Sequence, residues 1–176
     1  MATVDVLTFL YSSNLRNHIV SNLEDKMVFL GHMANMMLQI TPPIGFFNTF
    51  VVEKSGEHKD KFDLKVKGIT PLLNVVRLFS MEKGIKETVT LERIQALKSR
   101  HDLAEKYSEE LEHAYEFLML LRIHHQFEQI KAGQKPDNFI NPDQLSSLEK
   151  KTLKEAFHLM TKMQGLVSEK YKQFMR

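Results

Sequence analysis

The stretch Asp63-Leu64-Lys65-Val66-Lys67-Gly68-Ile69-Thr70-Pro71-Leu72-Leu73-Asn74-Val75-Val76-Arg77 decides how the rest of the chain is arranged. It predicts a strand that ends at Gly68, followed by a helix over residues 72–83. Thr70 is the expected N-cap of that helix, because its hydroxyl can accept a hydrogen bond from a free backbone amide. Pro71 fits the first turn, where no amide donor is needed.

Arg77 lies in the middle of this expected helix, which Gly84 is expected to end. Apolar residues occupy nearly the whole circumference of the helix, so we expect it to lie at the centre of the fold. A buried arginine needs a partner, since removing one member of a buried charge pair costs about 3–5 kcal/mol. The sequence therefore predicts a basic centre without saying what that centre binds.

Composition describes an ordinary globular chain of 176 residues, long enough for one domain with a core. A net charge of +2 is too small to indicate nucleic acid or a membrane surface as the partner. The absence of cysteine excludes disulfides and thiolate chemistry. Neither a signal peptide nor an apolar run of about 18 residues is present, so we expect a cytoplasmic protein.

Helical periodicity predicts four further helices, over residues 13–39, 91–100, 103–131 and 147–174. Thr90 is the expected cap of the second of these, and Gly133 is expected to close the third. Ser146 and Glu149 form a capping box at the start of the last.

Residues 46–52 and 62–66 read as two strands joined by a polar turn, which predicts a β-hairpin after the first long helix. The expected fold class is mainly α, a bundle of about five helices with this one hairpin. Residues 2–10 also read as a strand, and it has no evident partner in the chain. That strand indicates a preceding domain.

A helical wheel of the long helix places two polar residues in its apolar stripe. Arg122 and His125 both fall within about 60° of Leu118. In a functional interpretation, Lys65, Arg77 and Arg122 form the floor of an anion-binding pocket.

A structural interpretation of the same pattern stays open. There Arg122 pairs with an acid, and His125 donates to a backbone carbonyl. The candidate acids are Asp63, Glu82 and Glu116.

Two Glu-x-x-His pairs, Glu110 with His113 and Glu155 with His158, have the spacing of di-iron sites in helical bundles. The wheel of the last helix places His158 about 160° from the middle of its apolar stripe, so His158 is expected to face water. We therefore expect no metal site. Phosphate-binding loops and the common hydrolase motifs are also missing from the sequence.

A set of residues spread over the chain resembles the putative nucleotidyltransferase substrate-binding domain family. The set comprises Pro42-Pro43-Ile44-Gly45-Phe46-Phe47, Asp63-Leu64-Lys65, Gly68, Pro71, Arg77, Glu82-Lys83-Gly84-Ile85, Thr90, Arg93-Ile94, Leu121-Arg122, Gln126, Gly133, Asn138, Pro142 and Leu145. The resemblance runs from about residue 13 to the end of the chain.

In that family the domain usually lies at the C-terminus of bacterial signalling proteins. Cyclic-nucleotide-binding and CBS modules precede it, together with a nucleotidyltransferase domain similar to that of PII-protein uridylyltransferase. The resemblance implies a helical substrate-binding domain over residues 13–176, and a remnant of the catalytic domain or an N-terminal strand over residues 1–12. It also implies a nucleotidyltransferase partner, in cis or in trans, that carries the Mg²⁺ and the nucleotide. No cofactor is expected in this chain.

The chain lacks the catalytic signature of nucleotidyltransferases, a Gly-Ser followed by paired aspartates. We therefore expect a non-catalytic domain that binds a nucleotide or an acidic protein substrate, anions that suit the guanidinium fork. The expected contacts are Lys65, Arg77, Arg93 and Arg122, with His125 and Gln126 as hydrogen-bonding neighbours.

The alternative is a protein-interaction module that docks on its own catalytic domain or dimerises through the hairpin, which an exposed apolar hairpin face would favour. An independent enzyme would need an acid–base pair, and no such pair is evident. Neither nucleic acid nor a membrane is an expected partner.

Overall fold

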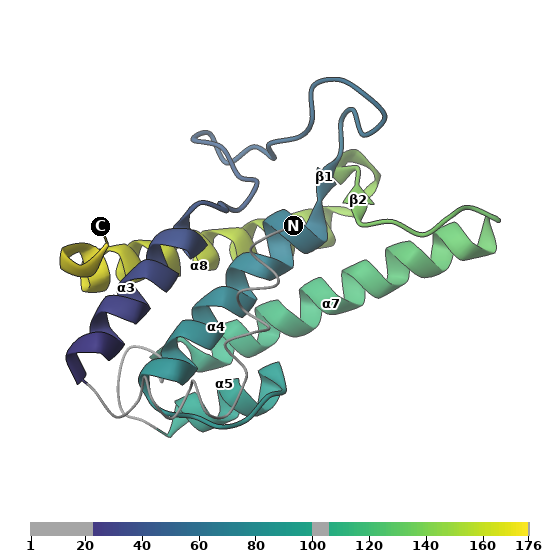
Figure 1. Cartoon of the computed structure of the whole chain (residues 1–176). Coiled ribbons are helices and arrows are strands. Elements are labelled where there is room, and N and C mark those ends of the chain that lie inside the picture. Colours follow the sequence, from purple (N-terminus) through teal and green to yellow (C-terminus); the bar gives the residue numbers. More distant parts are fainter. Residues whose placement is uncertain (1–22, 100–105, 176) are drawn as a thin grey trace.

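A computed structural model describes residues 23–99 and 106–175. This part of the chain forms five α-helices and one two-stranded antiparallel sheet (Figure 1). The expectation of a mainly helical fold with about five helices is thereby confirmed. The predicted strand over residues 2–10, the junction near residue 12 and the start of the first predicted helix lie outside the described residues.

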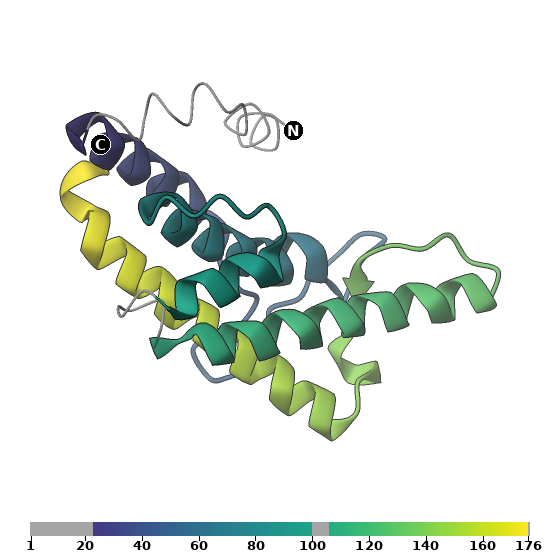
Figure 2. The ribbon, with the colours of Figure 1, turned by 90° about the horizontal axis from the view of Figure 1, so that it is seen from below.

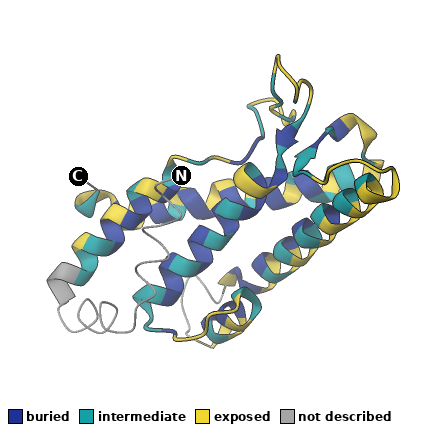
Figure 3. Cartoon of the chain, turned by 45° about the vertical axis from the view of Figure 1, so that its right-hand side comes forward, coloured by how far each residue is buried: buried dark blue, intermediate teal, exposed yellow. Residues whose placement is uncertain are grey.

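Helix α4, Thr70–Glu82, is the centre of the fold. It packs against α3 (Leu23–Leu38), α5 (Thr90–Lys98), α8 (Ser147–Tyr171) and the π-helix Leu64–Ile69. Most of its residues are buried, as the dark blue of this helix in Figure 3 shows. The predicted central helix is therefore confirmed, and its continuous apolar surface explains why other elements cover it on several sides.

Two predicted helix caps are wrong. Thr70 does not cap α4, because the N-cap position belongs to Ile69, whose backbone is already helical after the π-helix. The Thr70 hydroxyl donates instead to the Lys65 carbonyl at 2.8 Å. Thr90 is the first residue of α5, and its N-cap is Val89, which has no side-chain acceptor.

Three other helix boundaries follow the sequence signals, while the predicted helix end at residue 100 and helix start at residue 103 lie outside the described residues. Gly84 after α4 and Gly133 after α7 (Ser108–Lys131) have φ of +67° and +71°, a region that glycine enters without steric cost. Ser146 and Glu149 form the predicted capping box at the start of α8. This helix continues into a 3₁₀ turn, Lys172–Phe174.

The predicted β-hairpin is wrong. Strand β1, Phe62–Asp63, pairs with β2, Phe139–Ile140, with Phe62 opposite Ile140. A short 3₁₀ helix, Pro142–Gln144, follows β2 and leads to α8. The sheet therefore joins the segment before α4 to the segment before α8.

Local hydrogen bonds explain why the hairpin does not form. The Asp63 carboxylate accepts from the Val66 amide at 2.9 Å, which turns the chain out of the strand and into the π-helix. The first predicted strand is mostly irregular and contains a tight turn, in which the Gly45 amide donates to the Thr49 carbonyl at 2.8 Å. Only an isolated bridge between Ile44 and Phe50 flanks that turn.

Helix α7 packs against α5, α8 and the π-helix, and its buried residues lie between Ser108 and Leu121. Its second half extends beyond the rest of the bundle, with the loop that leads to β2 beside it, as Figures 1 and 2 both show. None of the helices in the described ranges combines the length and apolarity that crossing a membrane requires.

Candidate anion-binding site

A polar cluster lies where the second half of α7 meets the residues before β2. Nε of Arg122 donates to the side-chain oxygen of Asn138 at 2.7 Å, and Nε2 of Gln126 approaches the same oxygen at 3.3 Å. Nε2 of His125 lies 3.3 Å from the Asp137 carboxylate. Gln126 also donates to the Asp137 backbone carbonyl at 3.2 Å. Three residues predicted from the sequence therefore meet in one cluster.

Asp137 is the acidic member of this cluster. Partial burial alone would raise its pKa, but hydrogen bonds from the Phe139 amide, Gln129 and His125 outweigh burial and lower the pKa below the ordinary value. The Phe139 bond is 2.8 Å long. An ionised Asp137 thus orients His125 and holds the start of β2 against α7.

A backbone hydrogen bond joins the π-helix that carries Lys65 to this cluster. Leu64, the neighbour of Lys65, donates from the backbone amide to the Asn138 carbonyl at 2.9 Å. Lys65 itself is exposed on the π-helix. Asn138 therefore links the element that carries Lys65 to the helix that carries Arg122.

The remaining two predicted residues lie on other helices. Arg77 is half-buried on α4, where no hydrogen bond or ion pair joins it to another described residue. Arg93 is 6% exposed on α5, and its Nε donates to the Glu87 carbonyl at 2.7 Å, which holds the loop before that helix. Ligand binding by any of these residues stays a prediction.

The structural interpretation of Arg122 and His125 named the wrong partners. Arg122 binds a neutral amide, whereas Glu82 receives bonds from Tyr171 at 2.6 Å and from Lys170. His125 meets a carboxylate and not a backbone carbonyl. The terminal amines of the half-buried Arg122 guanidinium bind no described residue.

The two Glu-x-x-His pairs do not form one site. Glu110, His113 and Glu155 line a groove of about 270 Å³ between α7 and α8. His158 is exposed, as predicted, and its Nε2 lies 3.0 Å from the Asn48 side-chain oxygen on a distant loop. Among residues 23–99 and 106–175, no three His, Asp or Glu side chains are arranged to hold a metal ion.

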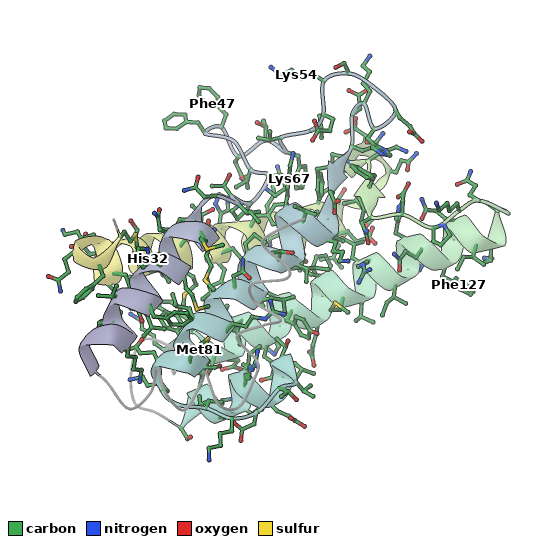
Figure 4. All side chains as sticks on the ribbon, viewed as in Figure 1. His32, Phe47, Lys54, Lys67, Met81 and Phe127 are labelled. Atoms are coloured by element: carbon green, nitrogen blue, oxygen red, sulfur yellow. The ribbon has the colours of Figure 1, made fainter. Side chains whose placement is uncertain are left out.

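Sequence reasoning missed two exposed apolar features. Phe46 and Phe47 are 96% and 83% exposed at the tip of the loop after α3, where Figure 4 shows Phe47 pointing away from the helices. The outer face of α7 also carries large apolar residues, among them Phe127. The helical wheel centred on Leu118 describes the inner face of α7. The exposed apolar residues lie on the opposite side of the same wheel.

Residues 27–171 match the family described as "Putative nucleotidyltransferase substrate binding domain". The chain belongs to this family. The matched region of this nucleotidyltransferase substrate-binding domain runs from α3 to the end of α8, so it includes α4, the π-helix and the polar cluster. Family membership implies association with a nucleotidyltransferase. The curated proteins and the solved structures contain no significant match to the chain.

Proposed function

We propose that this domain holds an anionic group of a nucleotidyltransferase substrate at Arg122, with Lys65 beside it. The group is a nucleotide phosphate or a carboxylate on an acidic protein substrate. Catalysis belongs to the nucleotidyltransferase domain, in cis or in trans, within a bacterial signalling protein. Arg77 remains a further candidate contact, while the bond from Arg93 to a backbone carbonyl favours a structural role for that residue.

The orientation of Arg122 is the observation that carries this proposal. Asn138 accepts from Nε, and no described residue accepts from the two terminal amines. Those two amines are the pair that a phosphate or carboxylate engages in a bidentate contact. A guanidinium that is held in place before the ligand arrives loses less entropy on binding.

Isothermal titration of the chain with ATP and with a glutamate-rich peptide tests the proposal. We expect binding of at least one of these anions, and loss of that binding in Arg122→Ala while the circular dichroism spectrum is unchanged. The matched control is Lys172→Ala, which removes the same charge from a side chain that is 68% exposed and paired with Glu169. Undiminished binding by Arg122→Ala, or no binding of either anion by the wild type, would contradict the proposal.

Docking on the catalytic domain is a second candidate function, favoured by the exposed phenylalanine pair. Phe46 and Phe47 pack edge to face with ring centroids 5.2 Å apart. The turn that carries them is held by the Gly45–Thr49 bond and by the contact between His158 and Asn48. Two aromatic rings held outward at a loop tip are suited to an apolar pocket on a partner.

The family description argues for a nucleotidyltransferase domain as that partner. A photo-reactive benzoylphenylalanine in place of Phe47 tests the docking. We expect a covalent adduct with a nucleotidyltransferase domain, identified by mass spectrometry. The same probe in place of Leu148, which is 73% exposed on α8, is the control and is expected to form no such adduct. Adducts with another protein class, or equal adducts from both positions, contradict the docking.

A further inference from the structure

The outer face of α7 carries a continuous apolar stripe over its second half. Leu120, Ile123, Phe127 and Ile130 are 67%, 56%, 55% and 59% exposed. Their spacing of three, four and three residues places them along one line of the helix. The buried residue Leu118 lies on the opposite side of the helix.

The stripe is as large as the largest apolar patch of a typical monomeric protein. Each of these side chains leaves about 100 Å² accessible, so together they form a patch of about 400 Å². The largest apolar patch on a typical monomer covers about 300–600 Å² and is often functional. The buried apolar residues of α7 lie on its other side, and the second half of the helix extends beyond the rest of the bundle.

We propose that a second copy of this chain covers the stripe, with the two α7 helices antiparallel. In this arrangement Leu120 faces the partner's Ile130 and Ile123 faces the partner's Phe127. Each pairing occurs twice, so all four residues of both stripes are buried. The three-four-three spacing is the one that allows two helices to interlock side chains over successive turns.

The charges at the two ends of the stripe favour the antiparallel over the parallel arrangement. Glu112 and Glu116 precede the stripe on the same face of α7. At the other end, Lys131 is the last residue of the helix and pairs with Glu128 at 3.1 Å, and Lys135 lies in the loop beyond it. An antiparallel pair places Glu112 and Glu116 of one copy beside the end of α7 that carries Lys131 and Lys135 in the other, whereas a parallel pair places the acidic residues of the two copies side by side. Opposite charges at the rim favour the matching arrangement and like charges disfavour the other.

The shape of the molecule also favours the antiparallel pair. Because the second half of α7 extends beyond the bundle, the bundle of an antiparallel partner lies beyond the end of the first copy's helix. Two stripes bury about 800 Å² of apolar surface, and the flanking side chains bring the total toward the roughly 1,200 Å² of the smallest stable interfaces. The inference does not depend on the anion site, because Ile123 and Phe127 lie away from His125 on the helix.

Analytical ultracentrifugation of the full chain tests the pairing. We expect a dimer at micromolar concentrations, and at least a 100-fold weaker association after Ile123→Glu combined with Phe127→Glu. Both side chains already face solvent in the monomer, so the double variant is expected to keep its melting temperature. Leu148→Glu, which changes an equally exposed side chain elsewhere, is expected to remain dimeric. A monomer at all concentrations up to about 1 mM, or a dimer that survives the double variant, overturns the proposal.

The absence of cysteine makes the orientation directly measurable. We expect a disulfide between Leu120→Cys in one copy and Ile130→Cys in the other when the two variants are mixed and oxidised. Each variant alone is expected to remain uncrosslinked, because the two copies of one position lie about 15 Å apart along an antiparallel pair. Crosslinking of each variant with itself, and not with the other, overturns the antiparallel arrangement.

Discussion

Nε of Arg122 and the side-chain oxygen of Asn138 are joined by a hydrogen bond of 2.7 Å, which links α7 to the residues that enter β2. The Asn138 backbone carbonyl accepts from the Leu64 amide on the π-helix at 2.9 Å. One asparagine therefore connects three segments that are far apart in sequence. The basic residue proposed to bind substrate is positioned by the same contacts that close the small sheet.

Asn138→Ala is expected to lower the free energy of unfolding by about 1.5–3 kcal/mol, because the lost acceptor serves a charged donor. Urea denaturation measures this change. A double-mutant cycle with Arg122→Ala is expected to give a coupling energy of about 1 kcal/mol between the two side chains. Additive effects of the two substitutions would mean that the bond contributes nothing to stability.

The contribution of Asp137 to the free energy of unfolding is expected to depend on pH in the acidic range. Folding lowers the pKa of Asp137 from 3.8, because its hydrogen bonds outweigh the opposing effect of burial. A carboxylate with a lowered pKa stabilises the fold above the unfolded pKa, and this contribution is lost as the pH falls through the folded pKa. Asp137→Asn is therefore expected to be less stable than the wild type at pH 5.

The difference in unfolding free energy between Asp137→Asn and the wild type is expected to shrink between pH 5 and pH 3. Urea titrations at a constant ionic strength measure it. A difference that stays the same over this range would show that the charge of Asp137 is not what stabilises the contact with α7.

Gly31 and Gly165 are expected to respond in opposite ways to alanine. A Cβ on Gly31 of α3 would collide with the Cβ of Phe174 and lie 2.7 Å from the carbonyl carbon of that residue. A Cβ on Gly165 of α8 would meet nothing within 4 Å. Thermal and urea unfolding are expected to show that Gly31→Ala destabilises by about 2 kcal/mol and that Gly165→Ala stabilises by about 1 kcal/mol. Stabilisation by both substitutions would refute the close contact between α3 and the last turn.

Ser146 and Thr90 provide a matched test of helix capping. The Ser146 hydroxyl accepts from the Glu149 amide at 3.2 Å, while Thr90 stands one position after its cap. Ser146→Ala is expected to cost about 1 kcal/mol of unfolding free energy, and Thr90→Ala less than about 0.5 kcal/mol. Equal losses in chemical denaturation would contradict this assignment of the caps.

The polar cluster could be predicted only in part. The wheel of α7 placed Arg122 and His125 beside Leu118, because a helix fixes which of its own residues share a face. Their partners Asp137 and Asn138 come from a loop more than ten residues away, and no periodicity specifies how a loop returns to a helix. The family resemblance named Asn138 without assigning it a contact.

The two-stranded sheet, like the polar cluster, could be predicted only in part. Residues 46–52 and 62–66 have the composition of strands, which is a weak and context-dependent signal. The Asp63 side chain ends β1 after two residues, and the partner strand comes from Phe139–Ile140. Two segments this far apart in sequence pair because α4 and α7 bring them together.

The sequence by itself determined the helices, the turns at Gly84 and Gly133, the Ser146 capping box and the family, since each depends on residues close together or on a pattern over the whole chain. The tertiary structure alone decided the pairing of β1 with β2, the partner of Arg122 and the exposure of the second half of α7. These depend on how helices pack against one another, and that packing follows from the shape of the buried surface as a whole.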